Sequence, residues 1–209
     1  MSGLTISSDN GTLVDNGDGT WSFTPATNDN SSVSIDYSID DGTDNVAAAA
    51  SFDITPVNDP PFIAAVADQT IDEDTSLEGL LVSASDVEFS GDQLFVVATS
   101  SNASLLSDGG VNVTYQGGNN WSVDLLPKAN QNGTTTIDLV VSDGDKTAAT
   151  SFVLTVNPVN DAPTGTVEIS GDPIVGQTLS ASNVIGDIDE FDEIQYPVSY
   201  THLTLPTKA

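Results

Sequence analysis

The chain has 209 residues, of which 31 are acidic and three are basic, so its formal net charge is −28. Proteins bind nucleic acids mainly through Lys and Arg, which neutralise phosphates and release counter-ions, so this charge excludes nucleic acids and anionic membranes as partners. Cysteine is absent, which excludes disulfides, thiolate nucleophiles and cysteine-based metal sites. Because so many carboxylates repel one another, the composition favours bound cations.

We expect that the chain neither spans a membrane nor carries its own secretion signal. No apolar stretch approaches the roughly 18 residues of a membrane span, and Met1–Thr5 lack the basic and apolar regions of a signal peptide. At the other end, Val198–Ala209 resemble a translated sequencing-library adapter, which we interpret as a non-native tail. The alternative is a terminal strand built on Tyr200, Leu203 and Leu205. We therefore expect no direct membrane insertion.

Five blocks of sequence occur twice in the same order. Val57-Asn-Asp-Pro-Pro61 returns as Val159-Asn-Asp-Ala-Pro163, an offset of 102 residues. The other pairs are Asn28–Asn30 with Asn130–Asn132, Ser34–Gly42 with Thr136–Gly144, Trp21-Ser22 with Trp121-Ser122, and Ser51-Phe52 with Ser151-Phe152. Such a period is typical of repeat arrays. We expect the end of one repeat at 1–59, a complete repeat at 60–161 and the start of a third at 162–197, so that the chain is a fragment of a longer protein.

Apolar residues in these repeats are spaced by two, which is typical of strands with one buried face. In chain order, Asp18-Gly19 favours a hairpin turn before Trp21, because Asp-Gly tolerates the positive φ of such turns. In the complete repeat the predicted strands lie near Ile71, Leu80–Val82, Leu94–Val97, Val111–Tyr115, Trp121–Leu125, Ile137–Val141 and Phe152–Val156. About seven strands in 102 residues predict an all-β fold of tandem Greek-key sandwiches. We expect Trp21 and Trp121 to pack in the cores.

Each repeat ends in an Asn-Asp pair followed by proline, which predicts a short, stiff linker. A carboxylate pair follows each linker at a similar distance: Asp86 and Glu88 after Asp59, and Asp187 and Asp189 after Asp161. Two carboxylates at i and i+2 on an extended segment face the same side. Because Ca²⁺ takes six to eight oxygen ligands from several segments, the repeated spacing favours one calcium-binding arrangement at both linkers. The alternative is that these carboxylates only solvate loops.

Residues 1–197 resemble the cadherin-like repeats of large bacterial surface adhesins and type I secreted proteins. The resemblance rests on Val-Asn-Asp-x-Pro at both linkers, on Asp68-Gln-Thr-Ile-Asp-Glu-Asp-Thr75 and on Val141-Ser-Asp-Gly144. It implies calcium at the junctions, with Asn58, Asp59, Asp86, Glu88 and Asp143 as ligands at the first, and Glu73, Asn160, Asp161, Asp187 and Asp189 at the second. Asp74 is a further candidate. Residues 164–179 are more similar to an immunoglobulin-like bacterial repeat.

An enzyme is not expected, because the body of the chain lacks the histidine or cysteine that would activate a nucleophile. The resemblance implies instead a calcium-rigidified stalk of a secreted or surface-anchored bacterial adhesin, with cell-surface proteins or glycans as partners through other domains. Two alternatives stay open, both as modules of a secreted polysaccharide-degrading enzyme. One is a glycan-binding sandwich, which needs exposed aromatic residues, and the other is a passive spacer without metal dependence.

Overall fold

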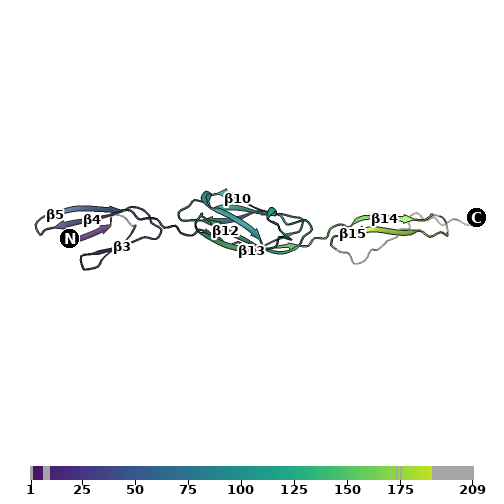
Figure 1. Ribbon diagram of the computed structural model, residues 1–209, viewed down its shortest axis with the longest axis horizontal. Coiled ribbons are helices and arrows are strands. Elements are labelled where there is room, and N and C mark those ends of the chain that lie inside the picture. Colours follow the sequence, from purple (N-terminus) through teal and green to yellow (C-terminus); the bar gives the residue numbers. More distant parts are fainter. Residues whose placement is uncertain (1, 7–9, 173, 175, 190–209) are drawn as a thin grey trace, which may run out of the picture.

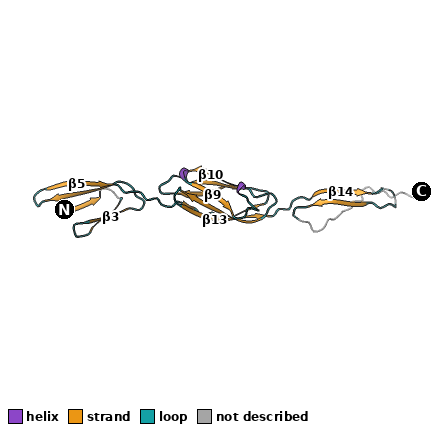
Figure 2. Cartoon of the chain, viewed as in Figure 1, coloured by secondary structure: helices purple, strands orange, loops and turns teal. Residues whose placement is uncertain are grey.

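The computed structural model describes residues 2–6, 10–172, 174 and 176–189. The tail predicted at Val198–Ala209, with His202, lies outside these residues, as does the stretch 190–197 of the predicted third repeat. The described chain forms three β units arranged end to end, joined by extended linkers without strands or helices (Figure 1, Figure 2). Each linker contains one of the two Asn-Asp pairs, so the units meet where the sequence repeats.

The first unit contains two small antiparallel sheets. One has the order β1-β4-β5 and the other is the hairpin β2-β3. The strands are β1 (Ser2–Ile6), β2 (Gly11–Asp15), β3 (Trp21–Pro25), β4 (Val33–Asp40) and β5 (Asn45–Phe52). The predicted turn before Trp21 is confirmed: Asn16 N–H donates to the Thr20 carbonyl at 3.0 Å, and Gly19 has a φ of +87°. Positive φ is accessible to glycine without steric cost.

The middle unit is a sandwich of two four-stranded sheets, with the orders β10-β11-β8-β6 and β7-β13-β12-β9. All neighbours are antiparallel except β7 and β13. The strands are β6 (Phe62–Ile63), β7 (Gln69–Asp72), β8 (Leu77–Ser85), β9 (Phe95–Ser100), β10 (Val111–Gly117), β11 (Asn120–Leu125), β12 (Gly133–Ser142) and β13 (Thr147–Asn157). Single 3-10 turns, Gly91–Gln93 and Asp108–Gly110, connect some of them. This strand order is the Greek key of immunoglobulin-like domains, which confirms the predicted fold class.

The core of the middle unit comes from alternate residues of facing strands. On β12, Ile137, Leu139 and Val141 are fully buried, and Asp138 between them is exposed. Trp121 on β11 is 3% exposed and therefore a core residue. Tyr115 is 40% exposed, although its spacing predicted an inward position, because β10 is the edge strand of its sheet. Burial of these apolar side chains supplies most of the stabilisation of such a sandwich.

The third unit is described as one antiparallel hairpin of β14 (Thr164–Ser170) and β15 (Ser180–Gly186), with Thr164 paired to Gly186. β15 ends at Gly186, which pairs with Thr164 next to the linker. The predicted pair Asp187 and Asp189 follows directly, and the Asp161 N–H of the linker donates to Asp189.

Candidate metal centres at the two junctions

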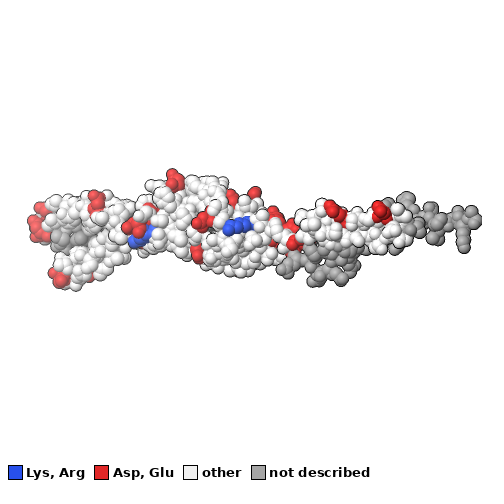
Figure 3. Space-filling model, turned by 45° about the vertical axis from the view of Figure 1, so that its right-hand side comes forward, with Lys and Arg blue, Asp and Glu red and all other residues white. Residues whose placement is uncertain are grey.

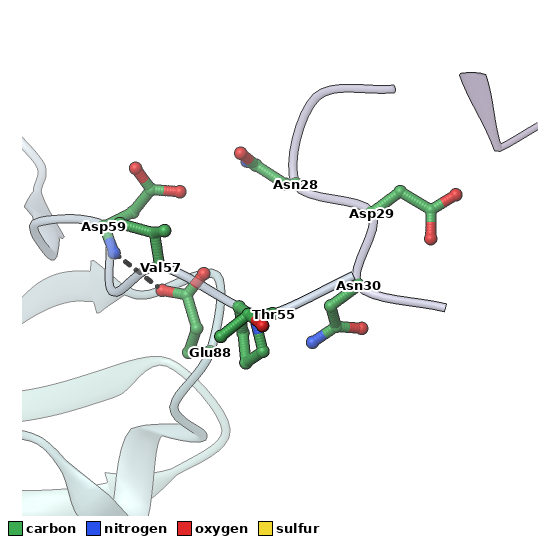
Figure 4. Close-up of a pocket in the computed structure, with 8 residues that line it drawn as sticks. Asn28, Asp29, Asn30, Thr55, Val57, Asp59 and Glu88 are labelled. Atoms are coloured by element: carbon green, nitrogen blue, oxygen red, sulfur yellow. Dashed lines mark hydrogen bonds between the residues drawn. The ribbon is translucent and has the colours of Figure 1, made fainter. Parts of the chain in front are cut away.

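The first junction consists of linker residues 55–59, the loop after β8 and the turn between β12 and β13. The Asp59 N–H donates to Glu88 Oε2 at 3.0 Å, and Asn58 Nδ2 donates to Asp143 Oδ2 at 2.9 Å. The loop 28–30 of the first unit and the Asp59–Glu88 pair line the same cavity of about 240 Å³ (Figure 4). Four predicted site residues from three distant segments therefore meet at this linker.

The pair Asp86 and Glu88 lies in a turn, and the extended geometry that we expected for it is wrong. Asp86 Oδ1 accepts hydrogen bonds from the backbone N–H groups of Glu88 at 2.8 Å and Phe89 at 3.0 Å. Asp side chains stabilise turns in this way because they bind backbone N–H groups two or three residues further on. The turn aims the Glu88 carboxylate at the linker and leaves Asp86 Oδ2 buried without a hydrogen-bond partner.

Asp143 occupies the tight turn between β12 and β13 and is 9% exposed. Its Oδ1 accepts from the backbone N–H groups of Lys146 at 2.6 Å and Asp145 at 2.7 Å. The Lys146 N–H is the main cause that lowers the pKa of the Asp143 carboxyl below its ordinary value, against the opposing effect of desolvation. Asp143 is therefore held as an anion next to the linker.

The second junction repeats the backbone contact of the first. The Asp161 N–H donates to Asp189 Oδ2, and the Asp189 N–H donates to Asp187 Oδ1 at 3.1 Å. The equivalent bonds at the first junction join Asp59, Glu88 and Asp86. Carboxylates spaced alike in sequence thus hold the two linkers alike.

A buried carboxylate fastens the second linker to the middle unit. Glu73 follows β7 and is 3% exposed; its Oε1 accepts from the Val159 N–H at 2.7 Å, and its own N–H donates to the Asn157 carbonyl at 2.9 Å. The neighbouring Asp74 accepts from the Asn130 N–H at 2.9 Å. The Asn160 side-chain amide donates to the Asp161 carbonyl at 2.7 Å, a bond within the linker.

Asp161 lies in a negative field. Burial is the first cause that raises the pKa of its carboxyl above 3.8, followed by repulsion from Asp74, Asp189, Glu73 and Asp187. Its Oδ2 is buried and has no hydrogen-bond partner. Acidic side chains also predominate over basic ones along the face shown in Figure 3. The carboxylates at the second junction therefore repel one another.

The donor set fits a hard cation, although the ligands are not gathered as a bound ion would hold them. Over residues 2–6, 10–172, 174 and 176–189, no three acidic side chains converge closely enough to enclose a metal ion. The same residues nevertheless contain three buried side-chain oxygens without a partner, Asn58 Oδ1, Asp86 Oδ2 and Asp161 Oδ2, and all three lie at the junctions. Buried polar atoms normally have a partner, and carboxylate and amide oxygens are the ligands that Ca²⁺ prefers.

The ligand prediction missed the loops that face each linker from the preceding unit. Asn28 and Asn30 line the first cavity, and Asn130 and Asn132 line cavities at the second junction. Asn28 and Asn130 both have positive φ, at 62° and 55°, which Asn tolerates better than most residues. The sequence signal was present, because Asn28–Asn30 and Asn130–Asn132 are one of the repeated blocks.

The strand order and the repeated junctions define an array of immunoglobulin-like β-sandwich repeats. Family comparisons agree: residues 1–55 match the cadherin-like domain family, and residues 58–157 match the bacterial Ig domain family. The chain is therefore a tandem array of cadherin-like and bacterial immunoglobulin-like repeats. Such domains are typically non-catalytic, and bacterial Ig domains are typical of extracellular and surface proteins. Among the described residues, no helix is long and apolar enough to cross a membrane.

A comparison with curated proteins finds no match. Among solved structures, an endo-fucoidan hydrolase of glycoside hydrolase family 107 is similar over 78% of this chain and 26% of its own, at 21% identity and a TM-score of 0.37. Titin domain M7 is similar over 49% of this chain and 99% of its own, at 15% identity and a TM-score of 0.37. The Ig1-2 module of the Drosophila receptor tyrosine phosphatase DLAR is similar over 54% and 57%, at 14% identity and a TM-score of 0.38. The chain thus spans about a quarter of the hydrolase.

Proposed function

We propose that this chain is a calcium-binding extracellular repeat array that acts as a rigid stalk of a bacterial surface adhesin. The observation that carries the proposal is the position of the three buried, unpartnered oxygens, which all belong to predicted ligands at the junctions. Burying a polar atom without a partner costs free energy. A cation at each junction would remove that cost and offset the repulsion between the carboxylates.

In this proposal two sets of ligands bind calcium. The ligands at the first junction are Asn58, Asp59, Asp86, Glu88 and Asp143, and those at the second are Glu73, Asn160, Asp161, Asp187 and Asp189, with Asp74 beside them. Carboxylates that repel one another stand apart when no cation is present, so we expect them to close by small side-chain rotations when calcium binds. Linker carbonyls and water would complete the six to eight oxygens.

The proposed mechanical role follows from the arrangement of the units. Each unit contacts only its neighbours in the row (Figure 1), as in other repeat proteins, so the shape of the whole depends on the linker angles. Calcium that joins the linker to loops on both sides would fix those angles. Extracellular calcium modules bind with Kd on the order of 10⁻⁴ to 10⁻³ M, so the sites would fill outside a cell and stay empty in cytosol.

The proposal extends to the repeat boundaries and the setting of the protein. We take 1–59, 60–161 and 162–197 as repeat segments and 198–209 as a non-native tail. Localisation would be extracellular or on the cell surface, and adhesion or biofilm formation would involve cell-surface proteins or glycans bound by other domains. In such a stalk calcium is the partner that this chain itself binds.

Thermal unfolding of the full chain in EDTA, in millimolar Ca²⁺ and in equimolar Mg²⁺ tests the proposal. At a free calcium concentration ten times Kd, each occupied site adds about 1.4 kcal/mol to the free energy of unfolding. We expect a calcium-selective rise in Tm that is reduced in Asp161→Asn. Equal Tm values in calcium and magnesium would instead indicate a passive spacer, and a glycan array would then test the remaining alternative.

A further inference from the structure

One peptide group of the first linker is held from both sides by opposite charges. The carbonyl oxygen of Asn58 accepts a hydrogen bond from Lys146 Nζ, and the N–H of the same peptide group, on Asp59, donates to Glu88 Oε2. Lys146 belongs to the turn between β12 and β13, whereas Glu88 belongs to the loop after β8. Two loops of the middle unit therefore form hydrogen bonds to the same peptide group.

The two bonds strengthen each other. A cation at the carbonyl draws electron density toward the oxygen, which makes the N–H of the same peptide group a better donor to the carboxylate on its other side. Hydrogen bonds with one charged partner are stronger than those between neutral groups. The Asn58 side chain adds a third bond to this turn through Asp143. The linker is thus fastened by protein groups that include a positive charge.

The second linker has the carboxylate half of this arrangement without the cationic half. The Asp161 N–H donates to Asp189, and the Val159 N–H donates to Glu73. Among the described residues the lysines are Lys128 and Lys146, and no hydrogen bond from Lys128 Nζ to this linker is present. The two junctions therefore differ in counter-charge rather than in backbone geometry.

We propose that Lys146 is a tethered counter-ion that fastens the first linker to the middle unit without calcium. This role of Lys146 does not rest on the function proposed above, whereas its consequence for calcium affinity does. In this arrangement the ammonium group satisfies a carbonyl that would otherwise be available to a metal ion. The first junction then binds calcium more weakly than the second.

Amide exchange of the Asp59 N–H, followed by NMR in EDTA on the full chain, tests the role of Lys146. Replacing the ammonium by a neutral amide in Lys146→Gln should accelerate this exchange about three- to tenfold, as expected for loss of one exposed charged hydrogen bond. Lys128→Gln makes the same charge change away from this peptide group and should leave the rate unchanged. Exchange of core amides such as Leu139 verifies that both variants stay folded.

The outcomes separate the two proposals. Unchanged Asp59 exchange in Lys146→Gln, or equal acceleration in Lys128→Gln, would overturn the tethered counter-ion. Acceleration confined to Lys146→Gln supports it, whether or not calcium restores the slower rate. Failure of calcium to slow exchange of the Asp161 N–H in the unsubstituted chain would instead contradict the calcium dependence of the second linker.

Discussion

The two junctions share one backbone contact and differ in the charges around it. At each, a linker Asp donates its N–H to a carboxylate two residues after another Asp, in a turn that follows a strand. The first junction adds Lys146 at the adjoining carbonyl, whereas at the second Asp74 and Glu73 add to the repulsion that Asp187 and Asp189 exert on the Asp161 carboxylate. The shared geometry shows how a repeat positions its linker. The difference shows that equivalent linkers can have different charged groups beside them.

The largest expected difference concerns the carboxylates that accept linker N–H groups. Glu73 is buried, and Glu88 is exposed. Glu73→Ala leaves the Val159 N–H without its buried acceptor. We therefore expect the free energy of unfolding in EDTA to fall by about 1–3 kcal/mol. In Glu88→Ala, water can accept the hydrogen bond of the Asp59 N–H in place of the carboxylate. We therefore expect the free energy of unfolding to fall by no more than about 0.5 kcal/mol.

Urea unfolding followed by the fluorescence of the buried Trp121 measures both changes. Glu73→Gln is the matched control, because its side-chain carbonyl can still accept from Val159, and it should retain more stability than Glu73→Ala. Equal losses of stability in Glu73→Ala and Glu88→Ala would show that the burial of the carboxylate does not determine how much it stabilises its linker.

Next in size is the effect of single ligands on calcium binding. Asp187→Asn removes one negative charge from the second junction, and ligand charge tunes calcium affinity. We expect about a tenfold loss of affinity there, equivalent to about 1.4 kcal/mol. Asp86→Asn is the corresponding change at the first junction and should leave the second site intact. Isothermal titration calorimetry on both variants measures these affinities. If Asp86→Asn lowered the affinity of the second site as much as Asp187→Asn does, the two junctions would not be separate calcium sites.

The smallest expected effect is on the pH dependence of stability, to which Asp161 and Asp143 contribute with opposite signs. The pKa of Asp161 is raised above 3.8, so in EDTA the stability contributed by this group falls as pH rises from 3.8 through the raised pKa. The pKa of Asp143 is lowered, so its contribution is present above 3.8 and is lost as pH falls through the lowered pKa.

Urea midpoints measured across the acidic range distinguish these two contributions. Asp161→Asn should remove the decline above pH 3.8, and Asp143→Asn should remove the loss below it. Calcium should abolish the first decline, since a bound cation favours the ionised carboxyl. If stability declined in the same way in Asp161→Asn, groups other than Asp161 would be its cause.

The sequence predicted the sandwich well because burial follows a period of two. Ile137, Leu139 and Val141 alternate with outward residues, and all three are buried as predicted. The hairpin turn at Asp18-Gly19 was also predictable, since local backbone chemistry determines it. Tyr115 was not, because its exposure depends on which strand ends the sheet.

The junctions were predictable only in outline. Repetition identified the carboxylates that reach the linkers, but not the turn that aims Glu88 or the opposing Asn28 and Asn130 loops. Lys146 gave no sequence signal, because the repeat places Asp44 at its equivalent position. A tethered cation at a linker is a tertiary contact between residues 88 positions apart, and no local pattern encodes it.

Distances between spin labels across each junction test the central claim most directly. The chain has no cysteine, so cysteines can be introduced in pairs at exposed strand positions: Ala49 with Ser83 across the first junction, and Ser151 with Ser182 across the second. The account predicts that the distance distribution across each junction is broad in EDTA and narrow in calcium, with the larger change at the second junction. Equal widths at the second junction in EDTA and calcium would contradict it.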